Sequence, residues 1–206
     1  MEKIDIDFYR RENVLQIARE LLGKIVVTGW KGVVTSGCIV EVEAYNGSND
    51  KASHAYNGRR TARNEMMYAA GGVAYVYLCY GIHHLFNVVT NSKEVPHAIL
   101  IRAVEPLKGE ESMLKRFGKA SSDGNRVDKL LTKGPGKLSK ALGITTLNSG
   151  YSLVSKELFI AADGFSFTKN EIAVSPRIGV DYAGKDALLP YRFYIKGNLF
   201  VSGKPK

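Results

Sequence analysis

The sequence predicts an α+β fold, and three observations support this prediction. Short β-branched runs separated by glycine turns recur along most of the chain, which is typical of strands joined by tight connections. A few other segments repeat apolar residues at helical spacing. The 206 residues contain no internal repeat, no low-complexity tract and no domain boundary, so we expect one domain over residues 1–206 with a proper buried core.

The first predicted element is an amphipathic helix over residues 7–23, which ends at the glycine Gly23. β-branched runs at residues 24–30 and 37–45 predict two consecutive strands. Residues 46–72 are polar and rich in Gly, Asn, Arg and Ser. We expect a long loop there, and long loops inside compact domains usually carry function.

The middle of the chain predicts a β-hairpin. Its strands cover residues 73–80 and 85–90, and residues 81–84 form the turn between them. A further strand is predicted over residues 97–104, followed by a short helix over residues 110–117.

The C-terminal part begins with a polar linker at residues 119–126 and a helix at residues 137–142. The rest is predicted to form strands with glycine turns, at residues 158–161, 171–174, 192–196 and 199–202.

The composition indicates a basic protein, with 29 Lys and Arg against 20 Asp and Glu and a net charge of +9. This balance suits a polyanionic partner, although a merely basic soluble protein would show it too. Cys38 and Cys79 are too few and too far apart for a disulfide framework or a zinc site. The N-terminus has no apolar h-region and no segment approaches a membrane span, so we expect a soluble cytoplasmic protein.

Two glutamates stand out in the predicted strand at residues 37–45. Strand alternation places Glu41, Glu43 and Tyr45 on one face, while the apolar face with Val40 and Val42 packs inward. Two carboxylates on an outer face are most often solvated edge charges. Glu43, however, lies at the strand end where the long polar loop begins, so it is also a candidate for chemistry.

The hairpin and the next strand supply further candidates. Tyr75 and Tyr77 share a strand face, whereas Tyr80 lies at the turn on the opposite face. Such tyrosines are usually ordinary sheet packing, but an aromatic residue at a hairpin tip can also unstack bases. Arg102 lies on an otherwise apolar face, so it needs a carboxylate or another anion as its partner.

Other chemistries find less support. The glycine turn at residues 133–137 precedes a helix and suits phosphate, but it lacks P-loop spacing. Residues 179–185 read G-x-x-x-x-G-K, yet Asp186 replaces the Ser or Thr that binds magnesium, which argues against a nucleotide triphosphatase. The four histidines show no metal-ligand spacing, and no G-x-S-x-G motif occurs. We expect neither a metal nor a cofactor.

A series of motifs in order resembles the alkyladenine (3-methyladenine) DNA glycosylase family over nearly the whole chain. They are Glu41-Val-Glu43-Ala-Tyr45, His54 with Gly58-Arg59-x-Thr61-x-Arg63-Asn64, Tyr75-Val-Tyr77-x-x-Tyr80-Gly81, Asn87, Leu100-Ile-Arg102-Ala-Val-Glu105-Pro106-Leu107, Gly134-Pro-x-Lys137-Leu138, Arg177-Ile-Gly179-Val180 and Leu189-Pro-x-Arg192-Phe-Tyr194-Ile.

The resemblance implies one mixed domain with a curved, mostly antiparallel sheet, flanking helices and a hairpin that projects into the minor groove of DNA. It also implies a monofunctional glycosylase of base excision repair that acts as a monomer on double-stranded DNA. Such an enzyme flips 3-methyladenine, 7-methylguanine, hypoxanthine or ethenoadenine out of the duplex and hydrolyses the N-glycosidic bond. In a bacterium it would associate with the nucleoid.

The resemblance also implies roles for single residues. Glu43 would be the general base that activates water, and Arg102 and the backbone carbonyl of Ile178 would help to hold that water. The residues implied to surround the flipped base are Tyr45, His54, Tyr77 and Asn87. Tyr80 would be the intercalating wedge. The other residues implied to contact DNA, some of them through phosphates, are Arg59, Thr61, Arg63, Ile82, His83 and Lys137.

Two alternatives stay open. A non-enzymatic nucleic-acid-binding module on the same fold would need the basic surface and Tyr80, but neither Glu43 nor Arg102. A bifunctional lyase would attack the sugar with a lysine amine, and the matched motifs place no lysine beside Glu43.

Overall fold

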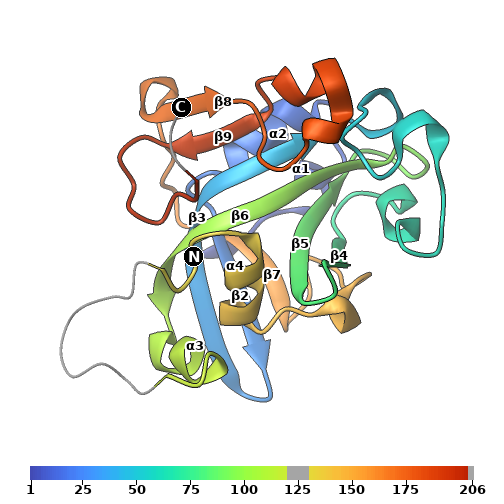
Figure 1. The fold of residues 1–206 in the computed structure, drawn as a ribbon. Helices are drawn as coiled ribbons and strands as arrows, with labels where there is room; N and C mark the ends of the chain where they lie inside the picture. Colours follow the sequence, from blue (N-terminus) through green and yellow to red (C-terminus); the bar gives the residue numbers. More distant parts are fainter. Residues whose placement is uncertain (120–129, 204–206) are drawn as a thin grey trace.

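The computed structural model describes residues 1–119 and 130–203 and confirms the predicted α+β fold (Figure 1). Most of the predicted linker at residues 119–126 lies outside the described residues. Within the described ranges nine strands form one antiparallel sheet: β1 (Glu2–Lys3), β2 (Ile25–Trp30), β3 (Val33–Tyr45), β4 (Ala74–Cys79), β5 (His83–Thr90), β6 (His97–Lys108), β7 (Leu158–Ala162), β8 (Ile172–Ser175) and β9 (Arg192–Ile195). The helices are α1 (Ile6–Tyr9), α2 (Val14–Leu21), α3 (Glu110–Arg116) and α4 (Pro135–Leu142).

Strand β3 is central over most of its length, from residue 36 to residue 45. Its first half pairs with β2 and its second half pairs with β9, while β6 runs along the other side. The order across the sheet is β1-β7-β2-β3-β6-β5-β4, and β8 pairs with β9. Glu41 and Glu43 have no exposed surface, because Arg102, Arg192 and Ile178 pack against their carboxylates. The interpretation of these glutamates as solvated edge charges is therefore wrong.

Three register shifts interrupt the pairing of β3 with β6, and two of them flank Glu41. Ile39 pairs with Val104 and Glu41 with Ala103, which leaves Val40 as an extra residue in β3. The next pair joins Val42 to Ile101, so Arg102 is the extra residue in β6. Bulges of this kind re-aim side chains and are common beside active sites. Here they lie where Arg102 meets the two buried glutamates.

The predicted N-terminal helix is wrong as a single element, because the chain forms two helices. Asn13 caps α2, and its side chain accepts a hydrogen bond from the backbone N–H of Gln16. An N-cap residue adopts extended backbone angles, so the helix that precedes it must end. The apolar face of α2 then packs on β3 and joins the main core.

The hairpin β4–β5 is confirmed, but its turn is shorter than predicted. Cys79 pairs with His83, so the turn consists of Tyr80, Gly81 and Ile82. Tyr80 has φ 52° and Gly81 has φ 73°, both in the left-handed region. That conformation is uncommon for a residue with a bulky side chain.

Three of the four predicted C-terminal strands are confirmed as β7, β8 and β9. The segment at residues 199–202 is not a strand, because the backbone N–H of Ser202 donates to the Glu41 carboxylate rather than to a neighbouring strand. Helix α4 begins two residues earlier than predicted, at Pro135, whose fixed φ suits the first helical position. In the described part of the chain we find no helix that is both long and apolar enough to cross a bilayer.

Candidate active site

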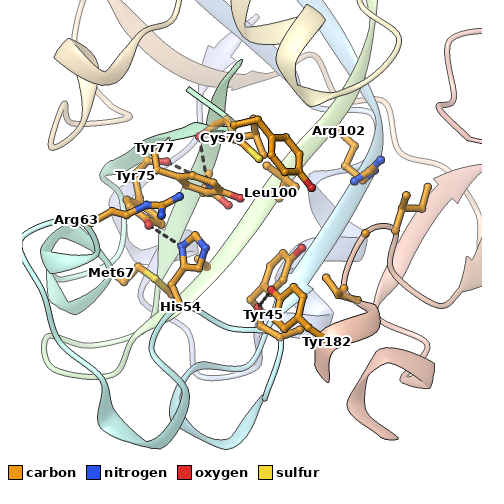
Figure 2. A pocket seen from close by; sticks show the side chains of 18 residues that line it. Tyr45, His54, Arg63, Met67, Tyr75, Tyr77, Cys79, Leu100, Arg102 and Tyr182 are labelled. Carbon is orange, nitrogen blue, oxygen red and sulfur yellow. Dashed lines mark hydrogen bonds between the residues drawn. The ribbon is translucent and has the colours of Figure 1, made fainter. Parts of the chain in front are cut away.

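A cavity of about 430 Å³ opens between the hairpin β4–β5, the ends of β3 and β6, and the segment that begins η6 (Asp181–Leu188) (Figure 2). This volume lies in the usual range for a small-molecule site. The residues that line it are Tyr45, Ala52, His54, Arg63, Met67, Tyr75, Tyr77, Cys79, Tyr80, Leu85, Asn87, Ala98, Leu100, Arg102, Ile178, Gly179, Val180 and Tyr182.

The Glu43 carboxylate lies behind this lining and is held by two hydrogen bonds and one ion pair from lining residues. The backbone N–H of Ile178 donates to Oε1 at 2.7 Å. The Tyr45 hydroxyl donates to Oε2 at 3.0 Å, and Arg102 Nη1 lies 3.2 Å from the same oxygen. The structure therefore brings together four residues that the resemblance assigned to the site. It also shows that Ile178 engages Glu43 through its amide, which the sequence did not indicate.

Glu41 holds Arg102 from the other side. Its Oε1 accepts from Arg102 Nε at 3.0 Å and from Arg192 Nε at 2.7 Å. The backbone N–H and the hydroxyl of Ser202 donate to the same carboxylate. Burial works against the charge of Arg102, but Glu43 and Glu41 outweigh it and raise the pKa of the guanidinium. Arg102 is thus a fixed positive charge between two carboxylates.

One wall of the cavity is aromatic. The rings of Tyr75 and Tyr77 lie 5.4 Å apart, and the His54 ring meets Tyr77 edge-on at 4.6 Å. His54 Nδ1 forms a 2.8 Å hydrogen bond with the Tyr75 hydroxyl. Burial, reinforced by the nearby Arg63 and Arg59, lowers the pKa of His54 to about 4. His54 is therefore a neutral imidazole at pH 7.

Tyr45 forms the opposite wall, and a buried ion pair supports it. The Arg177 guanidinium lies 4.8 Å from the Tyr45 ring centre and pairs with Asp50 at 2.5 Å. Arg177 also donates to the Ala44 carbonyl at 3.0 Å. Burial and the neighbouring Glu43 raise the pKa of the Tyr45 hydroxyl well above its usual value. The hydroxyl therefore stays protonated and donates to Glu43.

Asn87 lines the cavity from β5, next to the aromatic wall. Its side-chain NH₂ group donates to the backbone carbonyls of Tyr75 and Leu85, at 3.1 and 3.2 Å. Both N–H donors of this amide are thereby used, which leaves its oxygen as the group available to the cavity.

The hairpin tip projects into solvent beside the cavity. Tyr80 is 91% exposed and Ile82 is 72% exposed. His83 is also exposed, and it packs close to Gly136 at the start of α4, where a Cβ atom would lie 2.9 Å from the imidazole. The tip thus offers apolar surface, and helix α4 supports its base.

The polar and basic residues that are predicted to contact DNA differ in their surroundings. Arg59 and Lys137 are exposed. Arg63 is exposed too, but it donates to the Leu78 carbonyl at 3.1 Å and lies 5.1 Å from the Tyr77 ring centre. The Thr61 hydroxyl donates to Asn64 within its own loop.

Several supporting residues were missed by sequence reasoning. Asp50, Arg177 and Arg192 are buried and charged, which is rare without partners, but a single sequence does not show which charges are buried. Among the described residues no cluster of His, Cys, Asp and Glu could hold a metal ion. Directly after the G-x-x-x-x-G-K segment, the Asp186 carboxylate accepts a hydrogen bond from the backbone N–H of Lys51, which links this part of the chain to the loop after β3.

Known proteins match this sequence over nearly its whole length. The model of the family described as methylpurine-DNA glycosylase matches residues 7–199, which include the entire cavity lining. A protein of Chlamydia felis is 48% identical over 188 residues, covering 91% of this chain and 93% of that protein. A protein of Bacillus cereus is 48% identical over 201 residues, covering 96% and 97%. Both carry the name "Putative 3-methyladenine DNA glycosylase".

Proposed function

The chain belongs to the methylpurine-DNA glycosylase family, and on that premise we propose that it removes damaged purines from duplex DNA with a water molecule activated by Glu43. The family places the chain among enzymes that hydrolyse N-glycosidic bonds in DNA. The damaged purines we propose are 3-methyladenine, 7-methylguanine, hypoxanthine and ethenoadenine.

The observation that carries the proposal is the set of hydrogen bonds to Glu43. A carboxylate offers about four lone-pair sites. Oε2 already accepts from Tyr45 and faces Arg102, whereas Oε1 accepts, among the described residues, only from the Ile178 N–H. Oε1 therefore keeps one acceptor site, and Ile178, whose N–H donates to the same oxygen, lines the cavity. A water bound there would give a proton to Glu43 while its oxygen bonds to C1′ of the sugar. The C1′–N bond breaks in the same reaction, and the purine leaves with the electron pair of that bond.

The aromatic walls support recognition of an extruded base. A purine between Tyr45 and Tyr77 would stack on both rings, with His54 at its edge. Alkylated purines such as 7-methylguanine carry positive charge, so tyrosine stacking adds a cation–π attraction of about 0.5–2 kcal/mol. An intact neutral purine gains only ordinary stacking, which favours the damaged base.

The exposed hairpin tip supports extrusion of the nucleotide. Flipping a base costs a few kcal/mol, less where the base is damaged or mispaired. A Tyr80 ring inserted into the duplex would fill the vacated position, and stacking there is worth about 1–3 kcal/mol. Arg59, Arg63 and Lys137 would contact phosphates and position the duplex.

The test is incubation of the protein with four duplexes, each carrying one of the proposed lesions, followed by alkaline cleavage at abasic sites. We expect cleavage at the lesion and none in the undamaged duplex. DNA binding without any cleavage would instead support the non-enzymatic binding module. Borohydride trapping of a covalent complex would support the lyase alternative.

A further inference from the structure

Tyr182 is an aromatic residue at the mouth of the cavity that the proposed reaction does not yet use. It lies in η6, lines the cavity and is 69% exposed. Its hydroxyl donates to the Ala52 carbonyl at 3.0 Å, and its neighbours Val180 and Ala183 are buried. The ring is therefore held in place although most of its surface faces solvent.

The tether of the hydroxyl restricts which ligand groups Tyr182 can bind. A tyrosine hydroxyl has one proton to donate, and Ala52 receives it. The side chain consequently has no proton left for a phosphate oxygen. What it offers to a ligand is the apolar ring, already fixed, so that binding orders no further rotamer.

The position of the ring indicates which part of a nucleotide it meets. In Figure 2, Tyr182 lies beside Tyr45, across the cavity from His54 and Tyr77. Tyr75, in the depth of the cavity, is 1% exposed, whereas Tyr182 is 69% exposed. A base that enters this cavity occupies its buried part, and the sugar to which it is joined remains at the rim.

We propose that Tyr182 is a substrate-binding residue that packs against the deoxyribose of the extruded nucleotide. This inference rests on the proposed function. The fixed ring holds the sugar at the mouth, with C1′ facing the free acceptor site of Glu43. It thereby positions the nucleotide through its sugar rather than through its base.

The test uses a duplex with a tetrahydrofuran abasic analogue, which keeps the sugar ring and lacks the base. Tyr182→Ala should weaken binding to this duplex about fivefold, the lower end of the range for contact with an aromatic ring. Binding to the undamaged duplex should not change. Tyr182→Phe keeps the ring but loses the hydrogen bond to Ala52 that fixes it, so its affinity for the analogue should lie between those of Tyr182→Ala and the unchanged protein.

Leu188→Ala is the matched control. Leu188 lies at the end of the same segment, is 74% exposed and does not line the cavity. Its replacement should leave binding to both duplexes unchanged. Thermal unfolding of each variant shows whether a loss of binding reflects a loss of fold.

Two results would overturn the inference. One is unchanged binding of the tetrahydrofuran duplex by Tyr182→Ala. The other is weaker inhibition by free 3-methyladenine without weaker binding of the analogue, because the ring would then contact the base. Excision by the unchanged protein is measured separately, so absent excision contradicts the proposed function and is distinct from both results.

Discussion

Glu43 depends on distant parts of the chain for most of its contacts. Tyr45 is two residues away, but Arg102 and Ile178 come from other strands and loops. The strand position of Glu43 and its motif could be recognised in the sequence. Its complete burial could not, because burial follows from contacts with Arg102 and with Ile178, which lies 135 residues away in the chain.

Glu43→Gln should abolish excision while leaving DNA binding intact. The amide keeps the shape of the side chain but cannot accept the proton of the water, so we expect a loss of at least about 100-fold. Single-turnover excision of hypoxanthine from a duplex measures it. Glu105→Gln, the same change at an exposed position of β6, serves as the control. Unchanged excision by Glu43→Gln would remove this residue from the mechanism.

His54 makes the folded protein sensitive to acid. Its pKa is about 4 in the folded chain and near its usual 6.5 after unfolding, so between these values the unfolded chain binds more protons. The contribution to stability is complete above about pH 6.5 and is lost as the pH falls toward 4. Between pH 7 and 5 we expect the free energy of unfolding to fall by about 1–2 kcal/mol more in the unchanged protein than in His54→Gln.

Urea unfolding of both proteins at the two pH values measures this difference. His97, whose pKa burial also lowers, is present in both proteins and cancels in the comparison. Equal pH dependence in the two proteins would show that His54 does not titrate as described.

At the scale of elements, the hairpin β4–β5 combines a predictable feature with an unpredictable one. Alternating apolar residues and a glycine predicted the two strands. The turn was displaced because Tyr80 adopts a left-handed conformation, which sequence patterns favour for glycine or asparagine rather than for tyrosine. The same displacement leaves the Tyr80 side chain almost wholly in solvent.

Tyr80→Ser should reduce the extruded fraction of a lesion more than it reduces binding to undamaged DNA. The serine cannot fill the vacated stack, which an aromatic ring stabilises by about 1–3 kcal/mol. A 2-aminopurine beside the lesion reports extrusion by its fluorescence, followed by stopped flow. The difference in extruded fraction between Tyr80→Ser and the unchanged protein should be smaller for a lesion in a mismatch, because fewer base-pair hydrogen bonds are broken there. Full extrusion by Tyr80→Ser would show that the ring is not a wedge.

Strand alternation separated the two faces of β3 correctly, since Val40 and Val42 lie in the core and Glu41 and Glu43 lie together against Arg102. It could not show that the second face is covered, and Arg102, which helps to cover it, is the bulged residue of β6. A bulge needs two partner strands to be defined, and one strand's sequence does not reveal it. The buried charge cluster is therefore a property of the paired elements.

For the whole molecule, composition predicted a basic surface and a polyanionic partner, and family membership agrees with that expectation. Composition could not indicate which charges are free. Arg102, Arg177 and Arg192 contribute to the net charge of +9, yet all three pair with buried carboxylates. The basic side chains that could contact DNA phosphates are therefore among the exposed ones.

The salt dependence of DNA binding should identify them. Each phosphate contact contributes a slope of about −0.9 to the plot of log affinity against log salt. Alanine at Arg59, Arg63 or Lys137 should therefore reduce the slope by about one each. Lys169→Ala is the control, because it lies next to β8, at the opposite edge of the sheet from β4. Slopes parallel to that of the unchanged protein would place these residues outside the interface.

The hydrogen bonds and ion pairs of Glu41 also determine when, during synthesis of the chain, the buried site can form. Ser202, which donates to Glu41, follows it by 161 residues, and Arg192 follows it by 151. A ribosome that adds roughly 5–20 residues per second needs roughly 8–32 s to cover the longer separation. During that time the carboxylate at the centre of the sheet lacks partners that its burial requires. A nascent chain therefore cannot assemble this site before Ser202 has left the ribosome.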